Sequence, residues 1–483
     1  MVFKLWKNYN NRRLSLSFFA VLGLVGNDLF DGGVLAQDVK ASQLPSGMVS
    51  AAWYAGWHEQ SVPFDQVDWA KYTQMTYAFA VTTADDSAIS LATSDQQILP
   101  QFVSAAHSHG VKASLSIGGW TGSRYFSSHV ATSSNRTTFV QAITNVVQQY
   151  QLDGIDFDWE YPGVQGIGCN VVDPNDTSNF LSFLQELRSS PIGSKLILTA
   201  ATYVTPFADT TGQPSSDVSQ FSKVLDYITI MNYDMKSKPS TGAGPSSPLD
   251  DSCAPSAAQY GSATSAVTAW TKSGFPANQI VLGVPAYGHS WTVTPTDALP
   301  SSPTVLAAYP SYDPSKEKVG DAWDGTGGVD VCGVSQGPGG IYTYWGLINE
   351  GFLQQDGSVG GGIIYRYDNC SQTPYVYNPM SQVMVTYDNP QSFAAKGAFI
   401  KNEGLKGFAM WEAGGDYKSD LLGSILNSTI FSVAVPKTNQ PLGSSSDPHH
   451  SQAHSLTITS IYGVSIYHIT TLLLGLFSLH PLR

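Results

Sequence analysis

Charged side chains are scarce in this sequence. Of its 483 residues only 13% are Asp, Glu, Lys or Arg, and 24 basic residues stand against 37 acidic ones, for a formal net charge of −13. Binding to nucleic-acid phosphates needs a basic surface, and no larger group of Lys and Arg occurs after the first 13 residues. We therefore expect no nucleic-acid partner, and a neutral, polar partner fits better.

Cysteine is also rare. The four cysteines are Cys169, Cys253, Cys332 and Cys370, and none stands in a CxxC or Cys/His spacing typical of a metal site. We expect no metal and no other cofactor. Four cysteines in an exported chain can form two disulfides in three alternative pairings. Because Cys332 and Cys370 share one long segment, we predict that they pair and that Cys169 pairs with Cys253.

Long apolar runs are absent except near the two ends. The first run, residues 14–25, follows a basic N-terminus and is short for a membrane span. We predict that residues 1–36 are a signal peptide, with a signal anchor as the alternative. Residues 431–460 are a predicted Ser- and Pro-rich spacer, and the short apolar tail 461–483 is typical of a glycosylphosphatidylinositol (GPI) signal.

Two alternatives exist for that tail, a transmembrane helix and an uncleaved tail without function. We expect a secreted protein, or one held at the extracellular surface by a GPI anchor. Four Asn-x-Ser/Thr sequons are compatible with a glycoprotein, and they begin at Asn135, Asn175, Asn369 and Asn427.

Between residues 47 and 430, apolar strand-like segments alternate with amphipathic helical ones. The strand-like segments are 48–54, 75–81, 111–117, 154–159, 196–201, 227–231, 280–284 and 407–411. Helical spacing occurs at 97–109, 134–149, 177–189, 256–273, 392–403 and 418–426, and the helix of the fifth unit is obscure. Eight strand–helix units predict a TIM (β/α)8 barrel in the α/β class.

The segment 288–388, between the seventh and eighth strands, is much longer than a crossover requires. It is rich in Gly, Tyr and Trp. We predict a small α+β insertion subdomain that forms one wall of a cleft and divides the barrel into residues 47–287 and 389–430. The whole is expected to be a monomer.

The fourth strand ends in the most informative stretch of the chain. Side chains alternate along a strand, so Asp156, Asp158 and Glu160 share the inward face, and Phe157 and Trp159 point outward. Successive carboxylates lie roughly 6 to 7 Å apart and raise one another's pKa values. No Lys or Arg occurs in residues 151–168 to pair with them, which argues against a purely structural role.

Other strands also end in polar or aromatic residues. These are Ser116, Gly119 and Trp120 after the third strand, Met231, Tyr233 and Asp234 after the sixth, Tyr287 after the seventh and Trp411 on the eighth. Because the C-terminal ends of barrel strands meet at one mouth, we expect them around one site. Taken singly, some have structural interpretations: close packing for Ser116, or a place in the core for Met231 and Trp411.

In these motifs the sequence resembles glycoside hydrolase family 18, the chitinases. The DGxDxDxE signature is complete at Asp153–Glu160, and SxGG at Ser116–Gly119, MxYD at Met231–Asp234 and the terminal Trp411 follow in the family's order. The resemblance covers roughly residues 48–426. The long insertion is similar to that of the deep-cleft members.

The resemblance implies retaining hydrolysis of β-1,4-linked N-acetylglucosamine polymers, in which the sugar's own acetamido oxygen attacks the anomeric carbon. Glu160 would act as general acid and then as base. Asp158 would orient the acetamido N–H and stabilise the oxazolinium charge, and Asp156 would share a proton with Asp158. Tyr233 would donate a hydrogen bond to the acetamido oxygen.

The expected partner is chitin or chitooligosaccharides. We predict seven substrate-binding residues: the resemblance implies Ser116, Gly119, Met231, Asp234 and Trp411, and the aromatic residues Trp120 and Tyr287 are expected to extend the cleft. Two positions depart from the family pattern. His289 stands where many relatives place Arg, which leaves a cationic contact there open. It also stays open whether Trp53 or Tyr54 supports the inner aspartates.

Two other functions share this barrel. An endo-β-N-acetylglucosaminidase acting on N-glycans would use the same acids, usually without the insertion or the Tyr233 motif. A chitin-binding, lectin-like protein would keep the barrel and lose the acid. Because Glu160 is present, a catalytic role is favoured. No further cysteine-rich or repeat segment indicates a separate carbohydrate-binding module.

Overall fold

The structure is a computed structural model that describes residues 39–235 and 241–431. The predicted signal peptide, the spacer beyond its first residue and the predicted GPI signal lie outside the described residues. Within the described ranges, no helix combines the length and apolar character that crossing a membrane requires.

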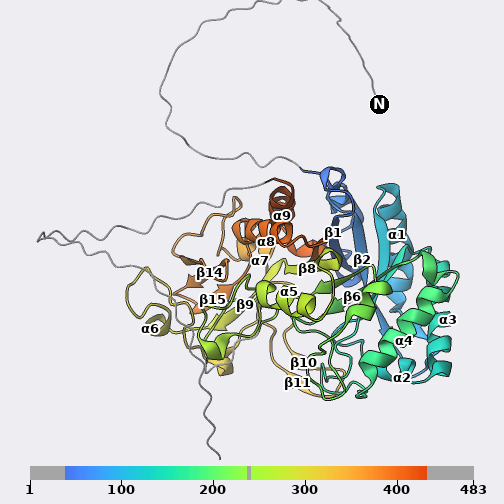
Figure 1. The fold of residues 1–483 in the computed structure, drawn as a ribbon. Coiled ribbons are helices and arrows are strands. Elements are labelled where there is room, and N and C mark those ends of the chain that lie inside the picture. The colour runs from blue at the N-terminus through green and yellow to red at the C-terminus, as the bar shows by residue number, and fades with distance from the viewer. Residues whose placement is uncertain (1–38, 236–240, 432–483) are drawn as a thin grey trace, which may run out of the picture. The chain divides into compact units, whose positions relative to one another are not determined.

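Eight parallel strands form a closed barrel at the centre of the fold (Figure 1). They are β1 (Val49–Ala55), β2 (Gln74–Thr82), β4 (Lys112–Gly118), β5 (Gly154–Asp158), β6 (Ile197–Thr202), β7 (Tyr227–Ile230), β8 (Ile280–Pro285) and β16 (Gly407–Trp411). Each strand pairs in parallel with the next, and β1 pairs with both β2 and β16, which closes the sheet. The short β3 (Ile89–Ser90) adds an antiparallel edge to β2. The TIM barrel predicted from the strand–helix alternation is confirmed.

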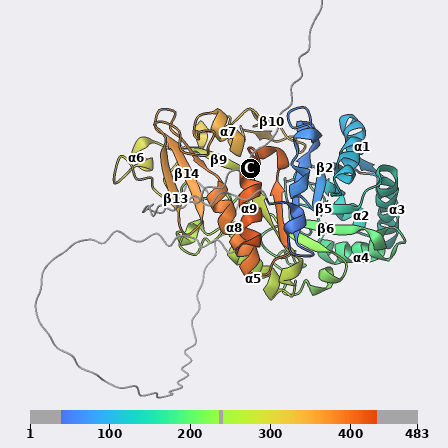
Figure 2. The same ribbon diagram turned by 90° about the horizontal axis from the view of Figure 1, so that it is seen from above.

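α-Helices surround the barrel (Figure 2). They are α1 (Thr93–Ser108), α2 (Phe126–Val130), α3 (Ser133–Tyr150), α4 (Asp176–Ser189), α5 (Ala263–Lys272), α8 (Pro390–Asn402) and α9 (Asp420–Ile430). The prediction of a helix from residue 256 was wrong in its first part. Helix α5 begins only after Ser262, whose hydroxyl accepts a hydrogen bond from the Ser265 N–H and thereby caps the helix.

The unit between β6 and β7 is irregular. Residues 203–226, all of them described, contain no α-helix, and their helical element is a short 3-10 segment at Ser219–Lys223. The lack of an α-helix agrees with the sequence, which shows no clear helical spacing in the fifth unit. The loop of this unit is therefore free to run along the mouth of the barrel, where Thr205 and Pro214 line a cavity.

A second sheet is built from residues between β8 and β16. Its antiparallel strands have the order β12-β9-β15-β14-β13, and the ranges are β9 (Tyr287–Thr292), β12 (Ile341–Thr343), β13 (Ile364–Asp368), β14 (Thr373–Asn378) and β15 (Val383–Thr386). A separate hairpin pairs β10 (Gly328–Val329) with β11 (Ser335–Gln336), and two short helices, α6 (Pro295–Ala298) and α7 (Tyr344–Asn349), complete the segment. Because β9 starts two residues after β8 ends, this sheet begins at the same barrel mouth as the predicted acids.

The disulfide pairing differs from the prediction. Cys169 is bonded to Cys332 and Cys253 to Cys370, whereas we predicted Cys169 with Cys253 and Cys332 with Cys370. Cys332 lies in the β10–β11 hairpin beside the loop after β5, and Cys370 follows β13 beside the loop after β7. The prediction was wrong because it paired Cys332 with Cys370 on the ground that both lie in one segment, whereas each of them lies beside a different barrel loop.

Candidate active site

Strand β5 carries the three predicted carboxyl groups to one end of the barrel. The strand ends at Asp158, one residue earlier than predicted, and Glu160 follows it. Asp156, Asp158 and Glu160 are buried, with 2%, 5% and 9% of their surfaces exposed. On the outer side, Phe157 packs edge-on against Phe180 of α4. The alternation of the strand therefore separates an acidic inner face from an apolar outer one.

Asp156 is fixed by donors from three other strands. In the strand register it pairs with Ser116 of β4 and Thr199 of β6. Its Oδ2 accepts hydrogen bonds from Ser116 Oγ at 2.8 Å and Trp53 Nε1 at 3.1 Å, and its Oδ1 accepts one from Thr199 Oγ1 at 2.6 Å. Burial raises the pKa of Asp156, and these three donors act in the opposite direction.

The question of Trp53 or Tyr54 is answered by these contacts. Trp53 reaches Asp156, whereas the Tyr54 hydroxyl donates to the Val62 carbonyl oxygen at 2.6 Å. The two residues are adjacent on β1 and so point to opposite faces.

Asp158 and Glu160 both favour their protonated forms. Burial, and then the charges of Glu160 and Asp156, hold the pKa of Asp158 well above its usual range. Burial raises the pKa of Glu160 to about 7, with a smaller contribution from the Asp234 charge, while a hydrogen bond with Tyr161 acts in the opposite direction. A carboxyl group with such a pKa can both give and take a proton near neutral pH.

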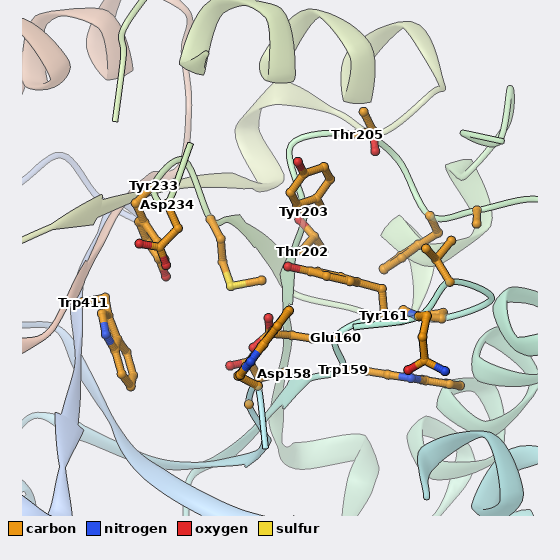
Figure 3. A pocket seen from close by; sticks show the side chains of 18 of the residues that line it. Asp158, Trp159, Glu160, Tyr161, Thr202, Tyr203, Thr205, Tyr233, Asp234 and Trp411 are labelled. Atoms are coloured by element: carbon orange, nitrogen blue, oxygen red, sulfur yellow. The ribbon is translucent and has the colours of Figure 1, made fainter. Parts of the chain in front are cut away.

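A cavity of about 840 Å³ opens above these acids. In Figure 3, Tyr233 and Asp234, which follow β7, lie across the cavity from Asp158 and Glu160, and Trp411 of β16 stands at its side. Among the described residues, no hydrogen-bond donor reaches the buried Asp158 Oδ1. An acceptor oxygen of the site is therefore left for a ligand to satisfy.

The structure gathers most of the predicted site residues at this cavity. Its lining includes Asp158, Glu160 and Tyr233 together with Gly119, Trp120, Met231, Asp234 and Trp411. Ser116 and Asp156 lie beneath the cavity and contact each other. Tyr287 lines an adjoining cavity of about 330 Å³, which shares Asp234 and Trp411 with the main one.

Asp234 joins the two cavities. Its Oδ1 accepts a hydrogen bond from the Tyr287 hydroxyl at 2.8 Å and lies 2.7 Å from His289 Nε2. The histidine that stands in the place of Arg thus contacts a carboxylate of the site. Sequence reasoning did not predict this pairing, because β9 belongs to the second sheet.

Aromatic side chains surround the mouth of the main cavity. Trp411 lies edge-on to Trp53, with ring centroids 5.9 Å apart, and stacks on Phe79 at 5.5 Å. Trp57 and Trp120 leave 57% and 50% of their surfaces exposed. Sequence reasoning missed Phe79, although it lies near the end of a predicted strand, which was the available signal.

The residues 39–235 and 241–431 contain no group of three or more His, Cys, Asp or Glu placed to hold a metal ion. Buried acids at the C-terminal end of a barrel strand, beneath a cavity lined by aromatic residues, are features of a glycoside-cleaving hydrolase.

Comparison with known proteins gives the family. Residues 49–416 match the family described as Glycosyl hydrolases family 18, and the chain belongs to that family. The expected enzyme class, a glycoside hydrolase, is thereby confirmed. A protein of Moniliophthora roreri named "chitinase-like effector" is 48% identical over 79% of this chain and 93% of its own length.

Two solved structures illustrate the structural likeness. A chitinase from Rhizomucor miehei has a TM-score of 0.69 and 33% identity, and the match covers 79% of this chain and 99% of that one. A class V chitinase from Nicotiana tobaccum, in complex with NAG4, has a TM-score of 0.63, 21% identity, and coverage of 80% and 100%. The second comparison shows the shared fold only.

Proposed function

We propose that this protein is a chitinase that hydrolyses β-1,4 bonds between N-acetylglucosamine units. The observation that carries the proposal is the line of Asp156, Asp158 and Glu160 beneath a cavity faced by Tyr233 and Trp411. The Rhizomucor miehei relative, 33% identical to this chain, is named a chitinase. This name supports the same substrate class for this chain.

Glu160 begins the reaction as the general acid. Its carboxyl group, protonated up to about neutral pH, gives a proton to the glycosidic oxygen as the bond to the anomeric carbon breaks. The acetamido oxygen of the same sugar attacks that carbon and forms an oxazolinium ion. Glu160, now a carboxylate, takes a proton from water, and the water opens the ion with overall retention of configuration.

Asp158 orients the acetamido group. Its unpaired, buried Oδ1 is an acceptor for the substrate N–H. As positive charge develops on the oxazolinium ion, the neighbouring carboxyl groups stabilise it. Asp156 shares its proton with Asp158, and its own position is fixed by Ser116, Thr199 and Trp53.

Tyr233 and Trp411 complete the sugar site. Burial and the charge of Asp158 hold the pKa of Tyr233 well above its usual range, so its hydroxyl stays a donor for the acetamido oxygen. Trp411 offers an apolar ring face on which the distorted sugar rests.

The test is to incubate the purified protein with chitin oligomers and, separately, with a high-mannose glycoprotein. Cleavage of the oligomers supports the chitinase, and release of N-glycans alone supports the endo-β-N-acetylglucosaminidase. The Glu160→Gln variant should bind the oligomers and not cleave them. A variant that turns over at the normal rate contradicts the role of Glu160.

A second candidate function is chitin binding without cleavage. It is favoured by one observation, the name "chitinase-like effector" of a relative that is 48% identical. The oligomer experiment separates the two functions. Binding of the oligomers by the unaltered protein, with no product after prolonged incubation, would establish this second function in place of the first.

We also propose that the protein is exported and held at the cell surface by a GPI anchor, on the sequence of its two ends. A phosphatidylinositol-specific phospholipase should release the protein from washed membranes. Protein that stays with the membranes after treatment contradicts the anchor.

A further inference from the structure

The main chain of Glu160 is held by the loop that follows it. Residues 161–173, which we call the acid loop, form most of the connection between Glu160 and helix α4. Asn170, near the end of this loop, donates a hydrogen bond from Nδ2 to the Glu160 carbonyl oxygen at 2.8 Å. Asn170 is itself buried, with 6% of its surface exposed. Glu160 and Asn170 are therefore linked away from solvent.

The neighbouring loop residues fit closely around this contact. The Asn170 N–H donates to Gln165 Oε1 at 3.0 Å, and Gln165 Nε2 donates back to the Asn170 carbonyl oxygen at 2.9 Å. A Cβ atom placed on Gly166 would lie 2.1 Å from the Glu160 carbonyl oxygen and 3.2 Å from Asn170 Nδ2. Only glycine at position 166 lets the main chain of the loop come this close to Glu160 and Asn170. The close fit gives the Asn170 side chain a defined position.

Two anchors hold the acid loop at the barrel mouth. Asp176 Oδ2 accepts hydrogen bonds from the N–H of Gly163 at 3.2 Å and of Asp173 at 2.9 Å, which ties both parts of the loop to α4. Next to Asn170, Cys169 is bonded to Cys332 of the β10–β11 hairpin. The second sheet's segment is thus joined covalently to the residue that precedes Asn170.

We propose that Asn170 is a positioning residue for Glu160, and that the Cys169–Cys332 disulfide keeps Asn170 in place. The inference rests on the proposed function in that Glu160 is the proton donor. A shift of about 1 Å in a catalytic group lowers turnover on the order of 100-fold. Loss of the Asn170 contact frees the Glu160 main chain and lets water approach its carboxyl group.

The first experiment compares Asn170→Ala with Asn175→Ala. Asn175 is the matched control, because its exposed side-chain amide donates a hydrogen bond to Asp173 and not to Glu160. Since Asn175 begins a predicted sequon, all proteins are compared after enzymatic removal of N-glycans. For cleavage of chitin oligomers, Asn170→Ala should lower kcat about 10- to 100-fold and leave KM within about threefold. Asn175→Ala should change neither. An unchanged kcat in Asn170→Ala, or an equal loss in both variants, overturns the proposal.

A second readout does not depend on turnover. The chain has only seven Glu residues, so selective 13C labelling of Glu carboxyl carbons gives few NMR signals, and Glu160→Gln identifies that of Glu160. Its titration midpoint should lie near 7 in the unaltered protein and move toward 4.5 in Asn170→Ala. The same midpoint in both proteins overturns the proposal, whether or not the protein cleaves chitin.

The disulfides supply a variant that leaves Asn170 intact. Replacing Cys169 and Cys332 by Ser should move the Glu160 midpoint and kcat in the same direction as Asn170→Ala. Replacing Cys253 and Cys370 by Ser is the control and should leave both unchanged. If the two pairs behave alike, the Cys169–Cys332 bond has no specific role in positioning Glu160.

Discussion

Glu160 keeps its proton near neutral pH because burial removes the water that would stabilise its charge. Asp158 and Asp156 occupy the same inner face and are also buried, and the charges of Glu160 and Asp156 add to burial in raising the pKa of Asp158. This arrangement opposes folding at high pH, because the folded chain must either keep the protons or bury several charges. Raised pKa values of this kind are typical of catalytic sites, where they serve proton transfer rather than stability.

The effect of pH on stability follows from Glu160 with a definite sign. Its pKa is about 7 in the folded protein and 4.5 without the fold, so between these pH values only the unfolded chain gives up the proton. Stability therefore falls as pH rises through this window, by on the order of 3 kcal/mol for this group. Glu160→Gln should be more stable than the unaltered protein at pH 8 and equal to it at pH 4. Denaturant unfolding at both pH values checks this, and an equal difference at both contradicts it.

Trp53 and Tyr54 offer a second test at this scale. Trp53→Phe removes a donor to Asp156 and should lower kcat on chitin oligomers about tenfold, with a loss of about 1–2 kcal/mol in unfolding free energy. Tyr54→Phe removes only a hydrogen bond to the Val62 carbonyl oxygen and should leave kcat unchanged. Measuring kcat and the unfolding free energy of both variants tests whether Trp53 or Tyr54 supports Asp156. A larger kcat loss in Tyr54→Phe would reverse the assignment.

The common inward direction of the three acids could be predicted from sequence, because side chains alternate along a strand and only one face of a barrel strand points into the barrel. The hydrogen bond from Trp53 to Asp156 could not be predicted, because the choice of Trp53 over Tyr54 depends on which face of β1 is turned inward after the barrel closes. The contact between His289 and Asp234 could not be predicted either, because it joins the second sheet to the loop after β7 and so depends on how the two are arranged in the folded chain.

At the scale of elements, Lys396 ties helix α8 to the loop after β7 by a hydrogen bond to Ser247, and it forms a buried ion pair with Asp388 just before the helix. Lys396 Nζ lies 2.6 Å from Asp388 Oδ1 and donates to Ser247 Oγ at 2.6 Å, and Ser247 donates to the Asn232 carbonyl oxygen. Both charged groups are almost fully buried. Burial lowers the pKa of Lys396 and raises that of Asp388, and their mutual attraction opposes both shifts. The pair thus supports the main chain next to Tyr233.

Removing one partner of this pair should be worse than removing both. Lys396→Met leaves the Asp388 carboxyl group buried without its cation and should lower the unfolding free energy by about 3–5 kcal/mol. Lys396→Met combined with Asp388→Asn should recover much of that loss. Denaturant unfolding measures both variants. A double variant as unstable as the single one would show that the two charges are not energetically coupled.

All eight barrel strands were predictable because each is an apolar run of strand length bounded by turn residues. The start of α5 was not, since residues 256–262 have helical spacing and yet precede the Ser262 cap. The second sheet was harder still. Its strands pair in the order β12-β9-β15-β14-β13, and nothing in the local pattern of 288–388 specifies that order.

For the whole molecule, the disulfides join parts of the chain that are far apart in sequence. They connect positions 163 and 117 residues apart, each between a barrel loop and the segment that forms the second sheet. The sequence-based pairing failed because it treated that segment as closed on itself. The observed pairing links the segment of the second sheet to two different barrel loops.

The Cys253–Cys370 bond should serve stability without affecting the chemistry. Replacing both cysteines by Ser should lower the unfolding free energy by about 2–5 kcal/mol and lower Tm, because the unfolded chain gains freedom. Cleavage of chitin oligomers below the new Tm should be unchanged. Calorimetry and an activity assay at 25 °C together check this prediction. A loss of activity without a loss of Tm would contradict it.

The central claim is that the substrate's own acetamido group attacks the anomeric carbon while Glu160 transfers the proton. Proton NMR of chitohexaose cleavage by the purified protein tests it most directly, because the anomers of fresh products can be read before they interconvert. We predict that the β-anomer forms first, that the α-anomer rises only later, and that Glu160→Gln forms neither. Products that are α from the start, or no cleavage by the unaltered protein, would contradict the account.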